Sequence, residues 1–237
     1  MSWVPNKTLR RALVAAALIA TAASAAANVL VVRASGPSAK SYPPGRSLPD
    51  NARITLRAND TLVILAGGGT RTFRGPGTFS PSAAVQAGNR TASTGTRRAR
   101  IGAVRSAGIV PHGPTIWHVD VTQSGTFCLS SANNVMLWRP DATDPIRLTI
   151  GDPGGGQRTI DWPAGQPTLA WPTGTTLVSG AAYSFRQPGV AVPVQITFRT
   201  LTSEPADLQG VAAALIANGC QGQLDLLVES APDQTAG

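Results

Sequence analysis

Two polar side chains that could do chemistry, His118 and Asp120, lie two residues apart in the alternating segment Trp117-His-Val-Asp-Val121. Residues i and i+2 of a strand share a face, so this spacing brings the imidazole and the carboxylate together. Such a pair can serve as a general base and its orienting group, as in a hydrolase. Ser124 and Ser130 are nearby hydroxyls, and no Gly-x-Ser-x-Gly motif marks either as a nucleophile. We therefore expect no catalysis and interpret His118 and Asp120 as a polar pair, with hydrolysis as an alternative.

Two glycine runs, Gly67-Gly68-Gly69 and Gly154-Gly155-Gly156, have the glycine content of phosphate-binding loops. Neither carries the Lys-Ser/Thr of a P-loop or opens a helix, and both stand between strand-like runs. They are therefore interpreted as hairpin turns. A zinc site would need His112 and His118 to complete it with the two cysteines, which is poor ligand spacing. We expect no cofactor and no metal.

Two tryptophans, Trp162 and Trp171, open a near-repeat of the form Trp-Pro-x-Gly, nine residues apart. Exposed indole rings on a β-sandwich can stack against sugars, because they offer flat apolar area and an N–H donor. This pattern gives the alternative function of a polysaccharide- or peptidoglycan-binding module. The competing interpretation is that both rings pack in the core.

The only two cysteines, Cys128 and Cys220, are isolated from one another in the sequence. In an oxidising compartment such a pair most simply forms one disulfide bond. That bond would close a long loop, which stabilises the fold by roughly 4–5 kcal/mol through chain entropy. It would also fasten the C-terminal helix to the β region. Two buried free thiols are the alternative.

Residues 1–27 have the three-part form of an export signal. The basic residues are Lys7, Arg10 and Arg11. An apolar run at residues 12–20 follows, and then small residues at the two possible cleavage sites, Ala23-Ser-Ala25 and Ala25-Ala-Ala27. A retained inner-membrane anchor facing the periplasm is the alternative, since residues 12–32 are long enough to span a bilayer. Both interpretations place the rest of the chain outside the cytoplasm, in the periplasm.

The net charge of +8 is unevenly distributed. Residues 28–105 hold twelve Lys and Arg against two acids, whereas residues 106–237 hold five Arg against ten acids. The charge layout is interpreted as a solvated, Arg-rich surface. The alternative is a basic face that docks on the acidic half or meets an anionic membrane surface. Nucleic acid is an unlikely partner, because no aromatic residues stand between the arginines of residues 81–115. The residues of this face are Arg53, Arg57, Arg71, Arg74, Arg97, Arg98 and Arg100.

Residues 53–79 contain apolar and alternating runs separated by Asn59-Asp60, Gly67–Gly69 and Gly75-Pro-Gly77. These are turn signals, so the stretch is predicted to be a β-meander. A first strand is expected at residues 28–34.

Residues 29–80 resemble a FecR-type periplasmic domain. The resemblance rests on the order Val-Val-Arg-Ala-Ser-Gly (31–36), Gly-Arg-Ser-Leu (45–48), the run 53–65, and Gly-Thr-Arg-Thr-Phe-Arg-Gly-Pro-Gly-Thr-Phe (69–79). In place of the family's Thr-Gly step, this chain has Ala58-Asn-Asp60. The resemblance implies a small non-catalytic β-fold in an envelope sensing or binding protein.

Short strands recur in the second half, at 117–121, 126–129, 135–138, 146–150, 158–162, 168–171, 182–185 and 192–198. Turn residues at this regular spacing indicate a β-sandwich. Pro193 indicates that the last strand is an edge or carries a bulge. Residues 207–218 are apolar at helical spacing and predict one C-terminal helix, with Ser203 as its N-cap. Residues 224–228 form a final helix or strand.

The predicted fold is therefore mainly β. It comprises a FecR-like β-domain (28–80), an Arg/Ser/Gly-rich linker or loop (81–115), a β-sandwich-like unit (116–202) and a C-terminal helix and tail (203–237). The expected function is that of an exported cell-envelope binding or sensory module without catalytic activity. Its expected partner is an envelope protein or a glycan. The alternatives are the glycan-binding module and an envelope hydrolase.

Overall fold

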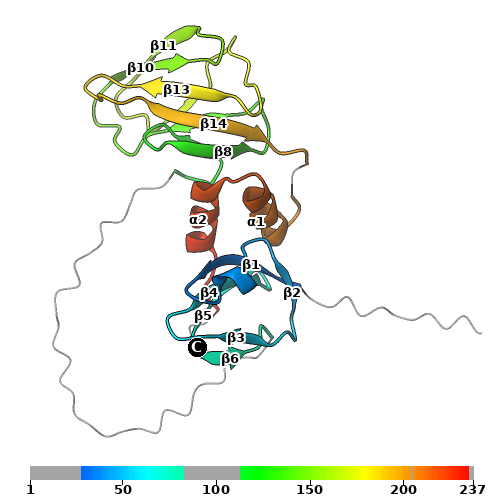
Figure 1. Cartoon of the computed structure of the whole chain (residues 1–237). Helices are drawn as coiled ribbons and strands as arrows, with labels where there is room; N and C mark the ends of the chain where they lie inside the picture. Colours follow the sequence, from blue (N-terminus) through cyan, green and yellow to red (C-terminus); the bar gives the residue numbers. More distant parts are fainter. Residues whose placement is uncertain (1–27, 83–112, 204, 235–237) are drawn as a thin grey trace, which may run out of the picture.

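The computed structural model describes residues 28–82, 113–203 and 205–234. The chain is mainly β, as the sequence predicts. A small β unit and a β-sandwich lie at opposite ends of the molecule, with two helices between them (Figure 1). The predicted signal segment and most of the predicted linker lie outside the described residues. In the described part of the chain, no helix is long and apolar enough to cross a membrane.

The small β unit is built on a four-stranded sheet of order β2-β1-β4-β5. Its strands are β1 (Asn28–Ser35), β2 (Ser47–Pro49), β4 (Thr61–Ala66) and β5 (Gly69–Arg74), and a 3-10 turn η1 (Ala39–Ser41) follows β1. The hairpin between β4 and β5 turns at Gly67 and Gly68, whose φ angles are 56° and 85°. Only glycine adopts such angles without steric cost, which explains the glycine run.

The predicted simple meander is wrong in one respect. Strands β3 (Ile54–Leu56) and β6 (Gly77–Phe79) pair with each other in a separate two-stranded sheet, and β4 pairs with β1 instead. The chain changes direction at Asp60, which is 2% exposed. Its Oδ1 accepts a hydrogen bond from Ser38 N at 2.9 Å, and its Oδ2 accepts one from Arg57 N. These bonds hold the corner that sends β4 into the other sheet.

The hydrogen bonds at this corner also set the acidity of Asp60. Burial raises the pKa of Asp60. The hydrogen bonds from Ser38 and the Arg57 backbone, together with the Arg57 guanidinium charge, outweigh burial and hold the pKa of Asp60 below its ordinary value. The corner therefore depends on an ionised carboxylate.

The second unit is the predicted β-sandwich, with two layers around one apolar core. The five-stranded layer has the order β11-β10-β13-β14-β8, and the three-stranded layer has the order β12-β9-β7. The strands of the larger layer are β8 (Gly125–Leu129), β10 (Ile146–Gly151), β11 (Gln157–Trp162), β13 (Ala182–Arg186) and β14 (Val194–Thr200). Those of the smaller layer are β7 (His118–Asp120), β9 (Met136–Trp138) and β12 (Thr168–Ala170).

Pro193 does not mark an edge or a bulge. Strand β14 lies inside the sheet, between β13 and β8, and Pro193 immediately precedes its first residue. Proline is tolerated there because its missing N–H interrupts no ladder.

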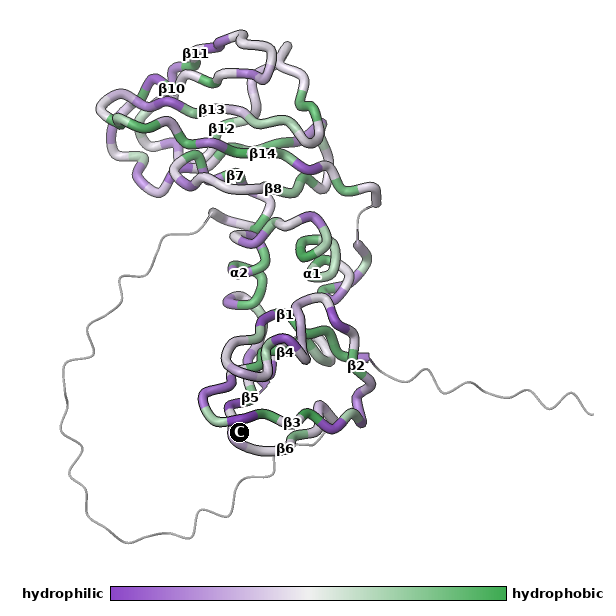
Figure 2. The backbone as a smooth tube through the Cα atoms, in the orientation of Figure 1, coloured by the Kyte–Doolittle hydropathy of each residue, from purple (hydrophilic) through white to green (hydrophobic). Residues whose placement is uncertain are grey.

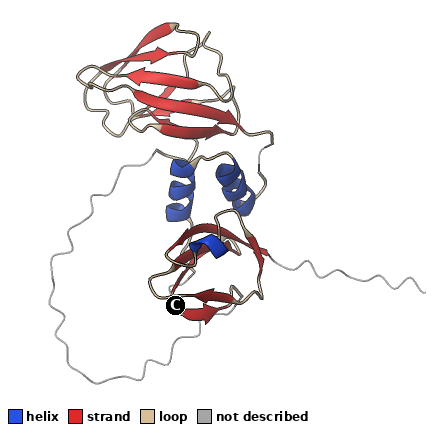
Figure 3. Ribbon diagram, viewed as in Figure 1, coloured by secondary structure: helices blue, strands red, loops and turns tan. Residues whose placement is uncertain are grey.

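Two helices follow the sandwich, α1 (Leu208–Ala217) and α2 (Gln221–Ser230) (Figure 3). The sequence predicts the first, and the element at 224–228, left open as a helix or a strand, belongs to the second. Asp207, rather than Ser203, caps α1 by accepting a hydrogen bond from Gly210 N at 2.7 Å. At the other end, Cys220 N donates to Leu215 O and Gly219 N to Ile216 O, which is a Schellman termination. The tight turn at Gly219 allows α2 to begin at once and pack beside α1.

The helices join the two β units. Leu215, Leu224 and Leu227 pack on the sheet of the small unit in one apolar cluster with residues of β1 and β4. Figure 2 shows hydrophobic residues along both helices and on the strands of the small sheet beneath them. The residues after α2 pair with the small unit, where Thr70 N donates to Pro232 O and Gln234 N donates to Thr70 O. The C-terminal segment therefore belongs structurally to both units.

The predicted disulfide bond is confirmed. Cys128 of β8 and Cys220 are bonded, with their Cα atoms 5.8 Å apart. Both residues are fully buried. The bond fastens the start of α2 to the edge of the sandwich, as the sequence predicted for the C-terminal helix.

Candidate functional site

A pocket of about 370 Å³ lies where the sandwich meets the start of α2. The edge strands of the two layers, β7 and β8, both contribute residues to it. Its polar lining comes from His118, Asp120, Gln123, Ser124, Thr126, Gln221 and Gln223. Its apolar lining comes from Phe127, Trp138, Ile196 and Leu226, and the glycines are Gly113, Gly125, Gly219 and Gly222. A mixed, partly aromatic concavity of this size is typical of a ligand site.

The two catalytic candidates, His118 and Asp120, both line this pocket. Each is hydrogen-bonded to a threonine of its own segment. His118 Nδ1 lies 2.9 Å from Thr115 Oγ1, and Asp120 Oδ1 accepts from the backbone N and the hydroxyl of Thr122. The carboxylate that would orient the imidazole is therefore engaged in a turn, and the imidazole is oriented by a hydroxyl.

The wall formed by α2 is fixed by Gln223, which is 3% exposed. Its Oε1 accepts a hydrogen bond from Cys128 N at 2.6 Å. Its Nε2 donates to Cys128 O at 3.0 Å and to Ile116 O at 2.9 Å. One side-chain amide thus joins α2 to β8 and to the segment that leads into β7. Together with the disulfide bond it sets the width of the pocket.

One glycine of the α2 wall leaves room in the pocket. A Cβ atom built on Gly222 meets no atom within 4 Å. Gly222 lines the pocket, so a side chain added there meets no steric barrier at its first atom.

The alternative of a sugar-stacking platform is wrong, and the interpretation that both rings pack in the core is confirmed. Trp162 is fully buried, and the partly buried Trp171 packs edge-on against Tyr183 and Phe198 at 5.7 and 5.6 Å between ring centroids. Each indole Nε1 donates to the carbonyl four residues on, Gln166 O for Trp162 and Thr175 O for Trp171.

The Trp-Pro-x-Gly repeat is therefore a turn motif. Gly165 and Gly174, the fourth residues of the two copies, have φ angles of 75° and 81°. This left-handed conformation brings the next carbonyl back to the indole N–H of the same copy.

The arginines predicted to form one basic face are divided. Arg53, Arg57 and Arg74 are exposed on the small unit. Arg71 is half-buried and donates to Gln234 Oε1 at 3.2 Å and to Pro81 O. Alternation along β5 places Arg71 and Arg74 on opposite faces of the strand. Arg97, Arg98 and Arg100 lie outside the described residues.

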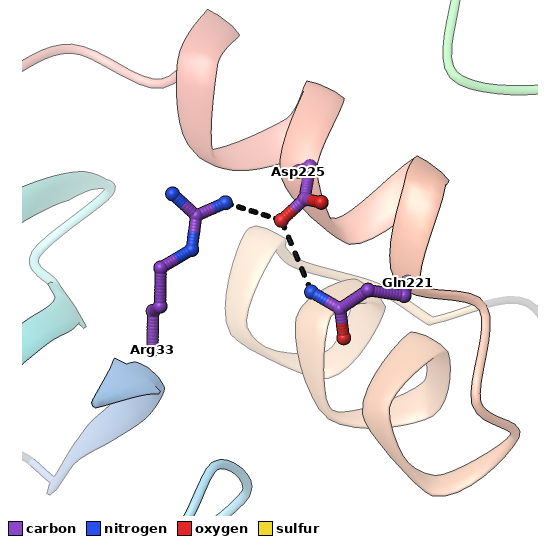
Figure 4. Close-up of polar contacts among 3 residues, drawn as sticks. All are labelled: Arg33, Gln221 and Asp225. Carbon is purple, nitrogen blue, oxygen red and sulfur yellow. Dashed lines mark hydrogen bonds and ion pairs between the residues drawn. The ribbon is translucent and has the colours of Figure 1, made fainter. Parts of the chain in front are cut away.

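The expected attraction between the basic and acidic halves occurs at a different residue. Arg33 of β1 forms an ion pair with Asp225 of α2, and the same carboxylate accepts a hydrogen bond from Gln221 Nε2 at 3.0 Å (Figure 4). Gln221 also lines the pocket. The small unit therefore contacts α2 within one turn of the pocket wall.

Three residues that define this site, Gln223, Trp138 and Phe127, stand outside the predicted set. Gln223 carries no sequence signal, because its bonds to Cys128 form only when α2 packs against β8. Within residues 28–82, 113–203 and 205–234, no cluster of His, Cys, Asp and Glu side chains is arranged to hold a metal ion.

Comparison of the chain with protein-family models, with curated proteins and with solved structures found no match in any of the three.

Proposed function

We propose that this chain is an exported cell-envelope module that binds a ligand in the pocket between β7, β8 and α2, and that it performs no catalysis of its own. The observation that carries the proposal is the pocket itself. Two independent contacts, the disulfide bond and the hydrogen bonds of the Gln223 amide, join the α2 wall of the pocket to β8. A preformed pocket binds with little ordering cost, because its walls need not be rearranged.

The polar groups of the pocket favour binding over hydrolysis. His118 and Asp120 are each committed to a threonine rather than to one another. A carboxylate on the second imidazole N–H strengthens a histidine base, and the Asp120 carboxylate bonds to Thr122 instead of taking that position. In the present arrangement the two side chains act as hydrogen-bonding groups at the rim of the pocket.

Export is supported by the disulfide bond, which is consistent with an oxidising compartment. It is also supported by the form of residues 1–27, either as a cleaved signal or as a periplasm-facing anchor. The resemblance of residues 29–80 to a FecR-type domain supports a sensory or binding role in the envelope.

The test uses the exported chain with its disulfide formed, beside two matched variants. Gly222→Ala adds only a methyl group, whereas Gly222→Phe places a ring in the space that no atom occupies. Both changes raise helix propensity, so neither is expected to destabilise α2. The three proteins are titrated with muropeptides, phospholipid headgroup analogues and linear peptides, and binding is followed by thermal shift and calorimetry.

The expected result is that at least one of these probes binds the parent chain and Gly222→Ala equally and Gly222→Phe at least about tenfold more weakly. Equal binding to all three proteins, or binding of none of the probe classes, contradicts the proposed function. Turnover of any bound probe that disappears in His118→Ala contradicts the non-catalytic part of the proposal.

A further inference from the structure

The open edge of β8 lies in the pocket. In the sheet order of the described residues β8 is terminal, with β14 on its inner side. The N–H and C=O of one strand residue point to the same side, and successive residues alternate. Cys128 directs both groups away from β14, because both bond to the Gln223 amide. By alternation, the N–H and C=O of Thr126 point to the same outer edge.

The Gln223 side chain shows how this edge accepts a partner. Its amide bonds the N–H and the C=O of one residue, which is how a neighbouring strand residue bonds to an edge. The Gln223 side chain therefore occupies the place that one peptide unit of a neighbouring strand would take beside Cys128. The next outward-facing position, Thr126, lines the pocket beside it.

Strand β7, on the other side of the pocket, offers a shorter edge than β8. His118 N donates to Thr115 O, and Asp120 O accepts from Gln123 N, so turns at both ends of this three-residue strand use two of its four outward groups. An extended segment in the pocket therefore meets its longer hydrogen-bonding edge at the five-residue strand β8.

The side chains of the pocket fit a peptide. Phe127, Trp138 and Leu226 give an apolar hollow next to the edge. Among the described residues of the lining, Asp120 is the one carboxylate and there is no Lys or Arg. An apolar side chain fits the hollow, and a basic neighbour in the same peptide complements the carboxylate.

We propose that the pocket binds an extended peptide segment by strand addition to β8 at Thr126, with an apolar side chain in the hollow and an adjacent Lys or Arg near Asp120. The inference rests on the proposed function, since it names the class of ligand for the same pocket. Main-chain hydrogen bonds to the edge supply affinity, and the hollow selects the side chain.

The test begins with a phage-displayed library of random linear peptides, selected on the exported, oxidised chain. Selected peptides are resynthesised with and without N-methylation at alternate backbone nitrogens, which removes strand hydrogen bonds and leaves the side chains unchanged. They are also measured against Gly222→Phe and Thr126→Pro. The proline removes the outward N–H of an edge strand, a position where it is tolerated. Circular dichroism and the melting curve check that Thr126→Pro is folded.

The expected result is a set of peptides with an apolar residue flanked by Lys or Arg. Each should lose at least about tenfold in affinity in one of its two N-methylated forms and in Gly222→Phe. Should Thr126→Pro fail to fold, the N-methylated peptides still decide the question.

Three results overturn the inference, and they separate it from the proposed function. Peptides that bind equally well in both N-methylated forms enter the pocket without strand addition. Muropeptide or lipid binding that Gly222→Phe abolishes, without peptide binding, leaves the proposed function standing and refutes the peptide. A dimer that Thr126→Pro abolishes makes a second copy of this chain the occupant.

Discussion

Replacing Gln223 is the most direct perturbation of the contact that joins α2 to the sandwich. Gln223→Leu keeps the approximate volume of the side chain and removes all three of its hydrogen bonds. It leaves Cys128 N–H, Cys128 C=O and Ile116 C=O without their present partner. Because Gln223 is 3% exposed, water does not readily replace the lost amide.

The expected loss follows from these three bonds. A hydrogen bond contributes a net of about 0.5–1.5 kcal/mol to folding, so Gln223→Leu should lower the free energy of unfolding by about 2–4 kcal/mol. Gln223→Glu should be worse at neutral pH. Its carboxylate still accepts from Cys128 N but faces two carbonyl oxygens where the amide donated at 2.9 and 3.0 Å.

The Glu variant also predicts a pH dependence with a definite sign. Burial and two facing carbonyls raise the pKa of the new carboxyl in the folded state above its unfolded value of about 4.3. The folded state then binds the proton more tightly than the unfolded state does. The variant therefore loses stability as the pH rises from about 4.3 through the raised folded-state pKa. It should regain stability as the pH falls, because the protonated carboxyl can donate to one carbonyl.

The assay is urea unfolding of the oxidised chain followed by tryptophan fluorescence, from pH 4 to pH 8. Gln157→Glu is the matched control, because Gln157 is exposed on β11 and the charge change is the same. The control should follow the parent profile within about 0.5 kcal/mol. If Gln223→Glu also matches the parent across this range, the amide does not hold α2 and the reasoning is wrong.

Three further perturbations have expected outcomes. Replacing Cys128 and Cys220 together by serine should lower the free energy of unfolding by about 4–5 kcal/mol, because the bond closes a separation of 92 residues; an unchanged urea midpoint contradicts this. The pKa of Asp60 is lowered in the folded state, so its stabilisation is present above the unfolded-state pKa of about 3.9 and is lost as the pH falls through the lower folded-state pKa; Asp60→Asn should therefore flatten the acid limb of the stability profile. Arg33 and Asp225 are 49% and 40% exposed, so Arg33→Ala should cost less than about 1 kcal/mol at low salt and nothing measurable in 1 M NaCl.

The fold was predictable where local pattern and burial agree. The alternating runs of the second half gave the sandwich, and the two isolated cysteines gave the disulfide bond. The pairing of β3 with β6 was not predictable from the run 53–79. Turn residues indicate where a chain reverses direction, and they do not indicate which strand it then pairs with. The pairing partner depends on the buried Asp60 corner, whose bond to Ser38 is distant in the sequence.

The candidate site was predicted only in part, for a similar reason. His118 and Asp120 were chosen for their chemistry, and they do line the pocket. Trp162 and Trp171 were chosen for the same reason, but their indole N–H groups have internal partners that the sequence does not display. Gln223 was overlooked because its role exists only once α2 lies against β8.

The position of α2 makes the pocket a property of the whole chain and not of the sandwich alone. One side of the helix supplies Gln223 and Leu226 to the pocket. Another side buries Leu224 and Leu227 against the small β unit, and the Arg33 ion pair meets it there. An isolated helix of this length is marginal in water, so α2 keeps its place only because both β units hold it. A peptide strand added to β8 next to Gln223 would therefore contact α2, the helix that also packs on the small β unit. Binding at the sandwich and packing on the small unit thus share one helix, which is a physical reason for the two β units to be joined in one chain.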